Sequence, residues 1–444
     1  MRIGVLGNGH VGLVTCVSLA EMGHDVIGCD RDDAKMSLLK RGVVHFYEPG
    51  VDAALARVLE GGNLRFTSDP DAALREAEVV FICVGTPGGV DGRADLSAVQ
   101  AAASDIARSC SGKVVVVQKS TVPIGTSELV HDVVSELNRD DLVVEVVSNP
   151  EFLREGRALH DALSPSRIVV GSRSAWAVDV MRELYRPLTS RGAAFVETDP
   201  HTAEVSKLAS NAFLALKISF ANALARVCEA ADADVVTAAD VMGMDPRIGR
   251  HFLNAGLGFG GFCLPKDVAA FDRLSSELGY DFPLLREVVR INDEALEVVI
   301  AKIDLALGGL RCRRVALLGL AFKPGTSDVR SAPALALAGR LRVAGASVVG
   351  YDPRASETAS DAMSELEVAA DPYVAATGAE CVVVCTEWEE FRELDLARLA
   401  SLMHRPILVD GRNFLDPWRA VAAGLEYIPM GRPSPALLGE VGLR

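Results

Sequence analysis

The chain has 444 residues, which is enough for two or three domains, and a formal net charge of −15. No run of like charges stands out in this acidic sequence, so we expect no nucleic-acid partner. The chain starts on a strand-like segment, and no apolar run approaches the roughly 18 residues of a membrane span, which predicts a soluble, cytoplasmic protein with no membrane partner. Nine cysteines follow no zinc-type spacing, so we predict no metal site and expect most of them to be reduced core residues.

The first predicted elements form a dinucleotide fingerprint. Residues 2–6 are apolar and strand-like, and a helical stretch over 13–22 follows a glycine-rich turn. The first glycine allows a tight bend, the second lets the backbone approach a pyrophosphate, and the third permits close packing of helix on strand. The candidate cofactor residues in this turn are Gly7, Gly9, Val11 and Gly12. We expect Asn8 and His10 to be plain turn and surface residues.

The second predicted strand, 25–29, ends at Asp30. A carboxylate at this position accepts hydrogen bonds from the adenosine ribose hydroxyls and repels a 2′-phosphate, so NAD is favoured over NADP. Lys35 is placed to reach the same ribose.

Three further apolar segments, 78–84, 113–118 and 143–147, are predicted strands of a parallel sheet covered on both faces. Each ends in polar or turn-forming residues. Ligands of open α/β sheets bind beyond the carboxyl ends of the strands. This places Thr86, Ser120 and Thr121 near cofactor or substrate.

From about residue 202 to 231 the pattern becomes one long helix, rich in alanine and apolar on more than one face. Such a helix joins two domains or packs against a second copy. Lys207 and Asn211 lie four residues apart on it, so they share one face.

The segment 258–267 places a single thiol, Cys263, between a glycine-rich turn and a predicted helix start at Pro265. The helix N-terminus and the neighbouring Lys266 favour thiolate over thiol. Asp267 follows one turn later. The pattern is typical of a nucleophile, although a buried cysteine in a loop has the same appearance when taken alone.

The last third predicts a second, degenerate Rossmann-like domain. Strand-like 313–320 is followed by a turn, 321–326, that lacks the three glycines but offers Lys323 for a phosphate. A later strand end carries Arg412. The predicted fold is therefore α/β, with two Rossmann-like parallel-sheet domains joined by a long central helix. The expected division is 1–200 for an NAD-binding domain, 201–307 for a helical region with the cysteine that joins the domains or packs against a second copy, and 308–444 for the second Rossmann-like domain.

These motifs, in this order, resemble the nucleotide-sugar 6-dehydrogenase family, which includes UDP-glucose and GDP-mannose dehydrogenases, over essentially the whole chain. The segments that carry the resemblance are 7–12, 83–87, 119–123, 149–156, Lys207 with Asn211, 258–267 and 322–323. The resemblance implies an enzyme that oxidises the C6 alcohol of a nucleotide-diphosphate glucose, UDP-glucose first, to the uronic acid, using two NAD per turnover.

The resemblance also implies roles for individual residues. The implied catalytic residues are Cys263, Asp267, Lys207, Asn211, Thr121 and Glu151. The residues implied to approach the nicotinamide cofactor are Glu155, Lys266 and Arg330. The implied contacts to the nucleotide sugar are Glu151, Phe152, Leu153, Arg154, Glu155, Lys207, Asn211, Phe252, Leu253, Asn254, Ala255, Gly256, Gly260, Lys323 and Arg412. Arg247 would reach a diphosphate in the neighbouring subunit, which implies a homodimer.

The chemistry fits the residue types. A thiolate that attacks an intermediate aldehyde gives a hemithioacetal, then a thioester that water hydrolyses. Lys207 with Asn211 would cradle a developing alkoxide. Glu151 and Glu155, if helical, would share one face, and one of them would serve as a general base provided that burial raises its pKa towards neutrality.

Other interpretations remain open. The substrate could be TDP-glucose, which differs from the uridine form by one methyl and one hydroxyl, because differences of this size shift selectivity by only about 10–200-fold. GDP-mannose and a UDP-N-acetyl sugar are further alternatives. A two-electron hydroxy-acid dehydrogenase would share the fingerprint but would need neither the cysteine nor a second Rossmann-like domain. An NAD-binding redox sensor with an exposed thiol is an alternative of another class.

Overall fold

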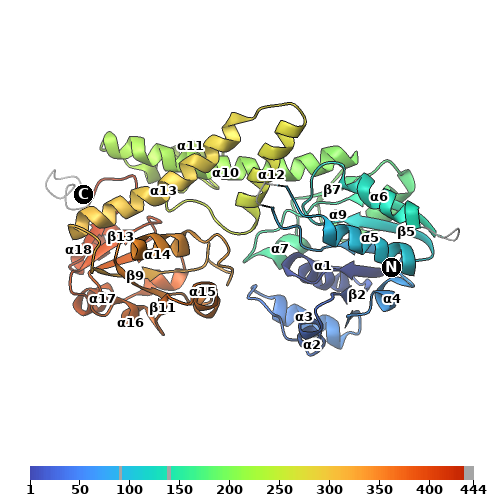
Figure 1. Cartoon of the computed structure of the whole chain (residues 1–444), viewed down its shortest axis with the longest axis horizontal. Helices are drawn as coiled ribbons and strands as arrows, with labels where there is room; N and C mark the ends of the chain where they lie inside the picture. The colour runs from blue at the N-terminus through green and yellow to red at the C-terminus, as the bar shows by residue number, and fades with distance from the viewer. Residues whose placement is uncertain (90–92, 138–141, 435–444) are drawn as a thin grey trace. The chain divides into compact units, whose positions relative to one another are not determined.

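The computed structural model describes residues 1–89, 93–137 and 142–434. Contacts divide the chain into two compact units, Met1–Ser210 with Arg273–Gly279 and Asn211–Asp272 with Tyr280–Arg444. Both are α/β units with mostly parallel sheets, and the long helix α10 (Pro200–Ala230) lies between the two sheets in the sequence (Figure 1). The predicted fold class is confirmed.

The first unit contains an eight-stranded sheet in the order β3-β2-β1-β4-β5-β6-β7-β8. Its strands are β1 (Arg2–Leu6), β2 (Asp25–Cys29), β3 (Leu64–Thr67), β4 (Val79–Ile82), β5 (Gly112–Gln118), β6 (Leu142–Ser148), β7 (Arg167–Gly171) and β8 (Ala194–Thr198). Neighbouring strands are parallel except β6 and β7, which pair antiparallel. The central β4 is buried along its whole length, as a strand covered on both faces requires.

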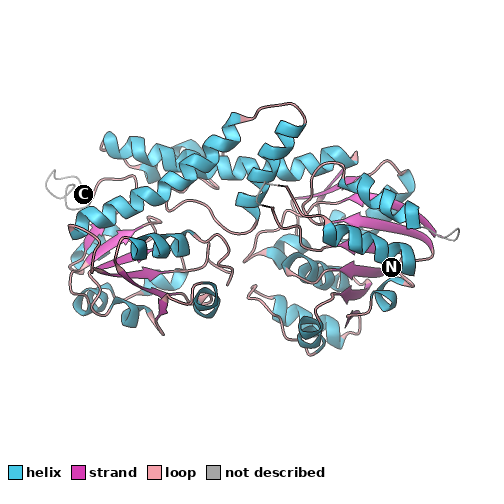
Figure 2. Cartoon of the chain, viewed as in Figure 1, coloured by secondary structure: helices cyan, strands magenta, loops and turns pink. Residues whose placement is uncertain are grey.

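Helices cover both faces of this sheet (Figure 2). They are α1 (His10–Glu21), α2 (Asp33–Lys40), α3 (Val51–Glu60), α4 (Pro70–Leu74), α5 (Ser97–Ser109), α6 (Thr126–Leu137), α7 (Ala158–Leu163), α8 (Ala175–Leu184) and α9 (Arg186–Thr189). One apolar core, which includes α1, α3 and α7, lies on one face of the sheet, and a second core with α5 and α6 lies on the other. The strand order reverses between β1 and β4, and the crevice at such a switch point is where doubly wound sheets bind ligands.

The second unit has a six-stranded, all-parallel sheet in the order β11-β10-β9-β12-β13-β14. Its strands are β9 (Arg314–Leu318), β10 (Ser347–Tyr351), β11 (Glu367–Val368), β12 (Cys381–Val384), β13 (Ile407–Asp410) and β14 (Glu426–Ile428). Its helices are α11 (Val235–Gly243), α13 (Pro283–Leu307), α14 (Pro333–Val343), α15 (Ser356–Ala362), α16 (Pro372–Ala376), the 3₁₀ helix η1 (Glu389–Glu393), α17 (Leu396–Leu402) and α18 (Pro417–Ala422). The order repeats that of the first six strands of the other sheet, which confirms the second Rossmann-like domain.

Helix α10 meets the length and composition of a membrane span, contrary to the expectation from the sequence. An 18-residue window in it has a mean hydropathy of 1.3, and 44% of that window is buried inside the structure. The helix also buries polar side chains that bond other parts of the protein: Glu204 accepts from Ser127, and Ser219 donates to the carbonyl of Val288. These contacts show that part of α10 packs inside the protein.

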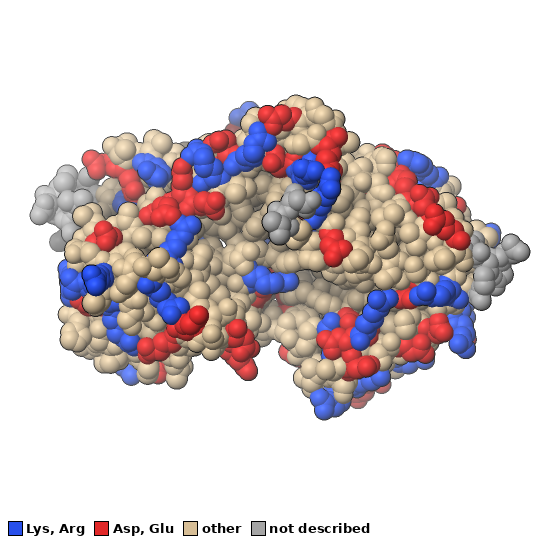
Figure 3. Space-filling view, viewed as in Figure 1, with Lys and Arg blue, Asp and Glu red and all other residues tan. Residues whose placement is uncertain are grey.

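All nine cysteines lie in described parts of the chain, and none of them forms a disulfide. Seven are buried, including Cys381 at the start of β12 and Cys385 directly after its end, which confirms that most of the cysteines are core residues. Acidic and basic side chains are interspersed over the face shown in Figure 3, without a broad basic patch on that face.

Candidate active site

The fingerprint turn has the geometry that a dinucleotide requires. Gly7 has φ +88°, and a Cβ on Gly12 would lie 1.8 Å from the Gly7 carbonyl oxygen, so helix α1 packs too close to the turn for any side chain. A Cβ on Gly9 would meet nothing within 4 Å. The protein itself therefore leaves open space at Gly9, where α1 begins and a pyrophosphate would approach. These residues fit NAD.

Asn8 and His10 are not plain surface residues, and that expectation was wrong. Asn8 is fully buried; its side chain donates to the Cys29 carbonyl at 2.9 Å and accepts from the Cys16 thiol. His10 stacks on Phe46, with ring centroids 4.4 Å apart, and its side chain is only 18% exposed. Side chains in a turn that connects a buried strand to a buried helix have little access to solvent.

Asp30 lies at the end of β2, as predicted. Its carboxylate accepts from the Asn8 backbone N–H at 2.8 Å and from Lys35 Nζ at 2.9 Å. Burial raises the pKa of Asp30, but these donors outweigh burial and hold it below its ordinary value. Asp30 is therefore ionised and fixed beside the fingerprint, and Lys35 lies next to it.

Loops after β4 and β5 come together at the same edge of the sheet. Thr86, which is 4% exposed, donates from its hydroxyl to the carbonyl of Thr121 at 2.8 Å. The Ser120 hydroxyl donates to the Val84 carbonyl at 2.7 Å. Parallel strand ends thus bring the predicted Thr86, Ser120 and Thr121 into one cluster.

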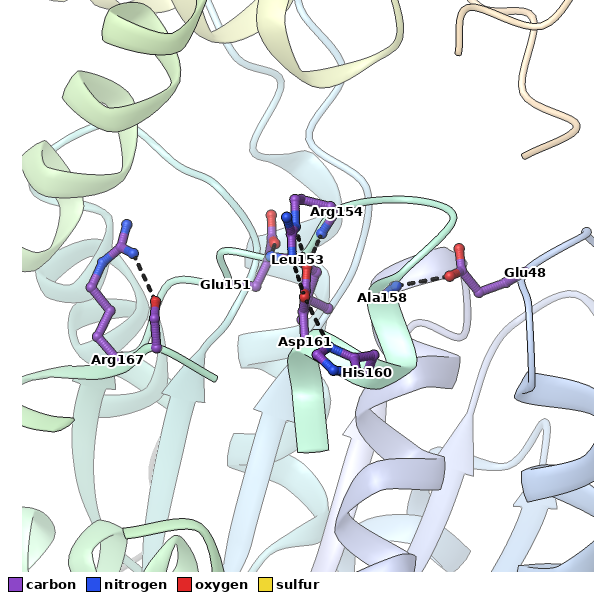
Figure 4. Close-up of polar contacts among 9 residues, drawn as sticks. Glu48, Glu151, Leu153, Arg154, Ala158, His160, Asp161 and Arg167 are labelled. Atoms are coloured by element: carbon purple, nitrogen blue, oxygen red, sulfur yellow. Dashed lines mark hydrogen bonds and ion pairs between the residues drawn. The ribbon is translucent and has the colours of Figure 1, made fainter. Parts of the chain in front are cut away.

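The segment 151–157 after β6 is irregular, and α7 begins only at Ala158. The predicted helical pairing of Glu151 with Glu155 is therefore wrong. Pro150 before the segment is compatible with a helix start, but Gly156 has φ +78°, a left-handed conformation that a continuous α-helix does not contain. Figure 4 shows the contacts that hold the segment instead.

Arg154 closes the segment onto α7. Its guanidinium donates to both carboxylate oxygens of Asp161, each at 2.7 Å (Figure 4). Burial raises the pKa of Asp161, but this pairing outweighs burial and holds the pKa below its ordinary value. Two cations lie over the ring of Phe152, with Arg167 3.8 Å and Lys207 5.6 Å from its centroid. Arg154 is thus engaged with protein, whereas the neighbouring Phe152 presents an aromatic face to cations.

Lys207 on α10 pairs with Glu151. The Nζ to Oε1 distance is 2.8 Å, and both side chains are almost fully buried. Leu153 donates its backbone N–H to the other carboxylate oxygen at 2.5 Å. Burial raises the pKa of Glu151, but Lys207 and this N–H outweigh it, so the pKa lies below its ordinary value. The condition set from the sequence, a carboxyl pKa raised towards neutrality, is therefore not met at Glu151.

In the second unit, α12 (Cys263–Glu277) begins at the cysteine itself, which confirms the predicted helix start. The turn before it is tight: Gly261 has φ +83°, and a Cβ on Gly260 would lie 2.1 Å from the Ser331 carbonyl oxygen. Arg330, next to Ser331, stacks over the ring of Phe262 at 4.3 Å and is held by Asp328. Close glycine packing thus brings the predicted Arg330 beside the cysteine turn.

Asp267 lies one turn into α12 and is fully buried. Asn211 Nδ2 donates to its Oδ2 at 2.6 Å, and Lys266 Nζ lies 2.7 Å from its Oδ1. The Lys266 cation compensates the charge of this carboxylate, and the neutral Asn211 amide donates a hydrogen bond to its other oxygen. The structure therefore brings together three of the predicted site residues of this unit.

The segment 252–256 precedes the cysteine turn. Phe252 has φ +66°, a left-handed conformation that an aromatic residue rarely adopts outside functional or strained sites. Leu253 and Ala255 are buried, and the Gly256 N–H bonds the Asn222 side chain at 2.8 Å. Asn254 accepts from Arg250 at 2.7 Å.

Two predicted cations of this unit follow strands β9 and β13. Arg412 donates from Nε to the Cys385 carbonyl at 2.7 Å, and its Nη1 lies 3.3 Å from the Gly258 carbonyl oxygen. Lys323 lies over the ring of Phe322. Arg247, by contrast, is 87% exposed and bonds only Asp245 among the contacts found for it, so this unit does not gather it with the others.

Two groups were missed from the sequence, one partly buried and one fully buried. Lys119 follows β5 and donates to the Asn149 side chain at 3.0 Å, next to the Tyr185 hydroxyl. Burial lowers the pKa of Lys119 to about 8. Glu48 is 1% exposed in the segment between α2 and α3. Lys119 stands in a motif that was recognised, but no periodicity distinguishes Glu48 from an ordinary loop residue.

Comparisons with known proteins match the whole of this architecture. The models of the UDP-glucose/GDP-mannose dehydrogenase family match in three parts: the NAD binding domain over residues 1–189, the central domain over 201–294 and the UDP binding domain over 316–417. The chain is 45% identical over 437 residues to the UDP-glucose 6-dehydrogenase of Rhizobium meliloti, covering 98% of this chain and 100% of the relative. It is 42% identical to the UDP-glucose 6-dehydrogenase TuaD of Bacillus subtilis, covering 98% and 94%.

Solved structures agree. A UDP-glucose dehydrogenase from Pyrobaculum islandicum has a TM-score of 0.90 at 38% identity, covering 97% of this chain and 98% of that one. A UDP-D-ManNAc dehydrogenase from Pyrococcus horikoshii has a TM-score of 0.86 at 30% identity, covering 97% and 99%. With family models matching in sequence order and relatives covering nearly its full length, the chain belongs to the UDP-glucose/GDP-mannose dehydrogenase family.

Proposed function

We propose that this protein oxidises the C6 alcohol of UDP-glucose to the carboxylate, in two steps of two electrons each, with Cys263 as the covalent nucleophile. The observation that carries the proposal is the placement of Cys263 at the first position of α12, one turn before a buried carboxylate, Asp267, that Asn211 holds. A helix N-terminus favours a thiolate, and a fixed carboxylate one turn away serves the water and proton steps.

NAD, when bound, accepts a hydride, and two NAD are used for each carboxylate formed. The first unit supplies its site: open space at Gly9, the N-terminus of α1, and the ionised Asp30 for the ribose. Val11, Thr86, Thr121, Glu155, Lys266 and Arg330 complete the proposed cofactor contacts.

Different residues of the chain act on different atoms of the substrate. The Cys263 thiolate adds to the C6 aldehyde, and the new C–S bond leaves an alkoxide on the C6 oxygen. Lys207 and Asn211, on successive turns of the continuous helix α10, supply an ammonium and an amide for that oxygen. Loss of a hydride from C6 gives a thioester; water adds to it, and the C–S bond breaks to return the thiolate.

Glu151 acts in its charged form. Because Lys207 and the Leu153 N–H keep its pKa low, it holds Lys207 in place and can accept a hydrogen bond from a substrate hydroxyl or a water. Thr121, in the loop after β5, orients that water. Asp267 is the second carboxylate available for the hydrolytic step.

The second unit supplies the proposed nucleotide-sugar contacts in the segment 252–256, at Gly260, Lys323 and Arg412, and the first unit adds Phe152, Leu153 and Arg154. Relatives at 42–45% identity carry the name UDP-glucose 6-dehydrogenase, whereas the UDP-D-ManNAc dehydrogenase is 30% identical, which favours UDP-glucose. TDP-glucose, GDP-mannose and a UDP-N-acetyl sugar are the alternatives.

We propose a cytoplasmic homodimer with the division 1–200, 201–307 and 308–444. Large apolar side chains recur every seven residues along α10, at Phe213, Phe220 and Val227, and they are 48–63% exposed. Met244, near the end of α11, is 79% exposed. This stripe would be covered by a second copy, and the exposed Arg247 would then reach the partner's diphosphate.

The test is the yield of NADH per molecule of limiting sugar, with UDP-, TDP- and GDP-linked sugars, on the wild type and on Cys263→Ser. Two NADH from UDP-glucose, with net turnover lost in the serine variant and kept in Cys312→Ser, support the proposal. One NADH points to a two-electron dehydrogenase, and none from any sugar points to a redox sensor.

A further inference from the structure

Glu48 is a buried carboxylate outside the site described above. Its side chain is fully buried, in the segment between α2 and α3. Its Oε2 accepts the Gly156 N–H at 2.7 Å. Its Oε1 accepts the Ala158 N–H at 2.8 Å (Figure 4). One carboxylate thus holds the end of the segment 151–157 and the first residue of α7.

The same carboxylate also meets the cofactor fingerprint. His10 Nε2 lies 2.8 Å from Glu48 Oε2, and the imidazole is stacked on Phe46. His10 is the first residue of α1, where the pyrophosphate of a dinucleotide would lie. Glu48 therefore links the start of α1 to the segment that carries Glu151.

The segment 151–157 depends on such links because it forms no helix: a turn bond from the Arg157 N–H to the Arg154 carbonyl, at 2.9 Å, lies within it, but α7 begins only at Ala158. It is tied at one end by Glu151 with Lys207, in the middle by Arg154 with Asp161, and at the other end by Glu48. Charged acceptors of backbone N–H groups are among the stronger hydrogen bonds in proteins, and a buried N–H that loses its acceptor is costly.

We propose that Glu48 is a positioning residue that couples cofactor binding to substrate binding, by fixing the segment 151–157 to the start of α1 through His10. The proposal rests on the proposed function, because it takes the segment as a nucleotide-sugar contact. In Glu48→Gln a single oxygen must serve two N–H groups, and the new amide N–H₂ faces one of them. We expect the apparent KM for UDP-glucose to rise about 10-fold or more, since one charged hydrogen bond is lost, with a smaller change in kcat.

The decisive measurement is the mutual effect of the two ligands on binding. Titrations give the dissociation constant of NAD with and without UDP-glucose, and that of UDP-glucose with and without NAD. We expect that in the wild type each ligand lowers the dissociation constant of the other. In Glu48→Gln this effect is reduced. His10→Phe keeps the stack on Phe46 and both backbone bonds of Glu48. In this variant we expect the mutual effect of the two ligands to be reduced, while UDP-glucose alone binds with nearly the wild-type dissociation constant.

Glu204→Gln is the matched control. Glu204 is 2% exposed and also accepts two backbone N–H groups, from Gly125 and Ser127, but has no link to His10 or to segment 151–157 among its hydrogen bonds. The proposal would be overturned if both glutamine variants lost the same stability and Glu48→Gln kept the wild-type effect of each ligand on the binding of the other. It would also be overturned if the wild type showed no such effect. The NADH yield of the wild type tests the proposed function separately: a yield of two with no coupling rejects only the role of Glu48.

Discussion

Asn211 on α10 donates a hydrogen bond to Asp267 on α12 over 2.6 Å, although the two residues lie 56 positions apart in the sequence. Asp267 is fully buried, and Lys266 lies on its other oxygen at 2.7 Å. The amide therefore orients the carboxylate that stands one turn from Cys263.

Asn211→Ala removes this donor. We expect kcat to fall at least 10-fold, and the free energy of unfolding to fall by about 1–3 kcal/mol because a buried carboxylate oxygen loses its partner. Steady-state kinetics and urea unfolding measure the two effects. Ser219→Ala is the control: it removes a buried hydrogen bond from the same helix, to the Val288 carbonyl, and should lower stability without lowering kcat. Unchanged kcat in Asn211→Ala would contradict a role for this pair.

The cysteines should differ sharply in reactivity. Cys263 is partly exposed and Cys312 is exposed, whereas the other seven are buried and burial raises their pKa, to about 12 for Cys83, Cys381 and Cys385 among others. Iodoacetamide near neutral pH should label Cys263 and Cys312 first, because the thiolate is the reactive form. Mass spectrometry locates the label. Activity should be lost in proportion to the labelling of Cys263, and iodoacetamide should inactivate Cys312→Ser in the same way. Inactivation in proportion to the labelling of a buried cysteine would refute this prediction.

Lys207→Met should change how stability depends on pH. In the wild type the folded pKa of Glu151 lies below 4.5, so the pair stabilises the protein above that pH, and this contribution is lost as pH falls through the folded pKa. Without Lys207, burial raises the pKa of Glu151, and the variant is least stable, relative to wild type, at neutral pH. Urea unfolding between about pH 4 and 8 should show that the difference in the free energy of unfolding between wild type and Lys207→Met becomes smaller as the pH falls. Lys217→Met loses bonds to backbone carbonyls only, so its difference in the free energy of unfolding from wild type should stay the same across this pH range.

Lys119 should affect stability at the alkaline end. Burial lowers its pKa from 10.5 to about 8, so the unfolded chain binds a proton that the folded chain has lost between these values. Wild-type stability should therefore rise with pH across this window relative to Lys119→Met, by about 3 kcal/mol, since one pKa unit is worth about 1.4 kcal/mol. Lys113→Met, at the exposed end of the same strand, is the control. A flat difference between wild type and Lys119→Met would contradict the buried charge.

Asp30→Asn should weaken the preference for NAD. The amide keeps an acceptor for the Asn8 N–H but removes the charge that repels a 2′-phosphate. We expect the ratio of kcat/KM for NAD over NADP to fall about 10-fold or more, the effect of one lost charge-assisted interaction. Asp32→Asn, at the neighbouring N-cap of α2, is the control. If the effect is specific to Asp30, this variant should keep the wild-type ratio of kcat/KM for NAD over NADP.

Much of this protein was determined by local sequence. The glycine turn after β1, Asp30 at the end of β2, Lys207 with Asn211 on α10 and Cys263 at the start of α12 were all predicted where the structure has them. Helix starts, strand ends and i,i+4 faces depend on neighbours in the chain, so their signals survive without a tertiary context.

Only the tertiary structure decided the rest. The sequence of the segment 151–157 carries no local signal strong enough to exclude the helix that its spacing of carboxylates suggests. The contact that holds the segment irregular comes from Glu48, more than 100 positions away. Burial and charge partners likewise decided that Glu151 is held ionised by Lys207 and that His10 is packed on Phe46. Desolvation and ion pairing act through space, and residues that are distant in sequence supply them.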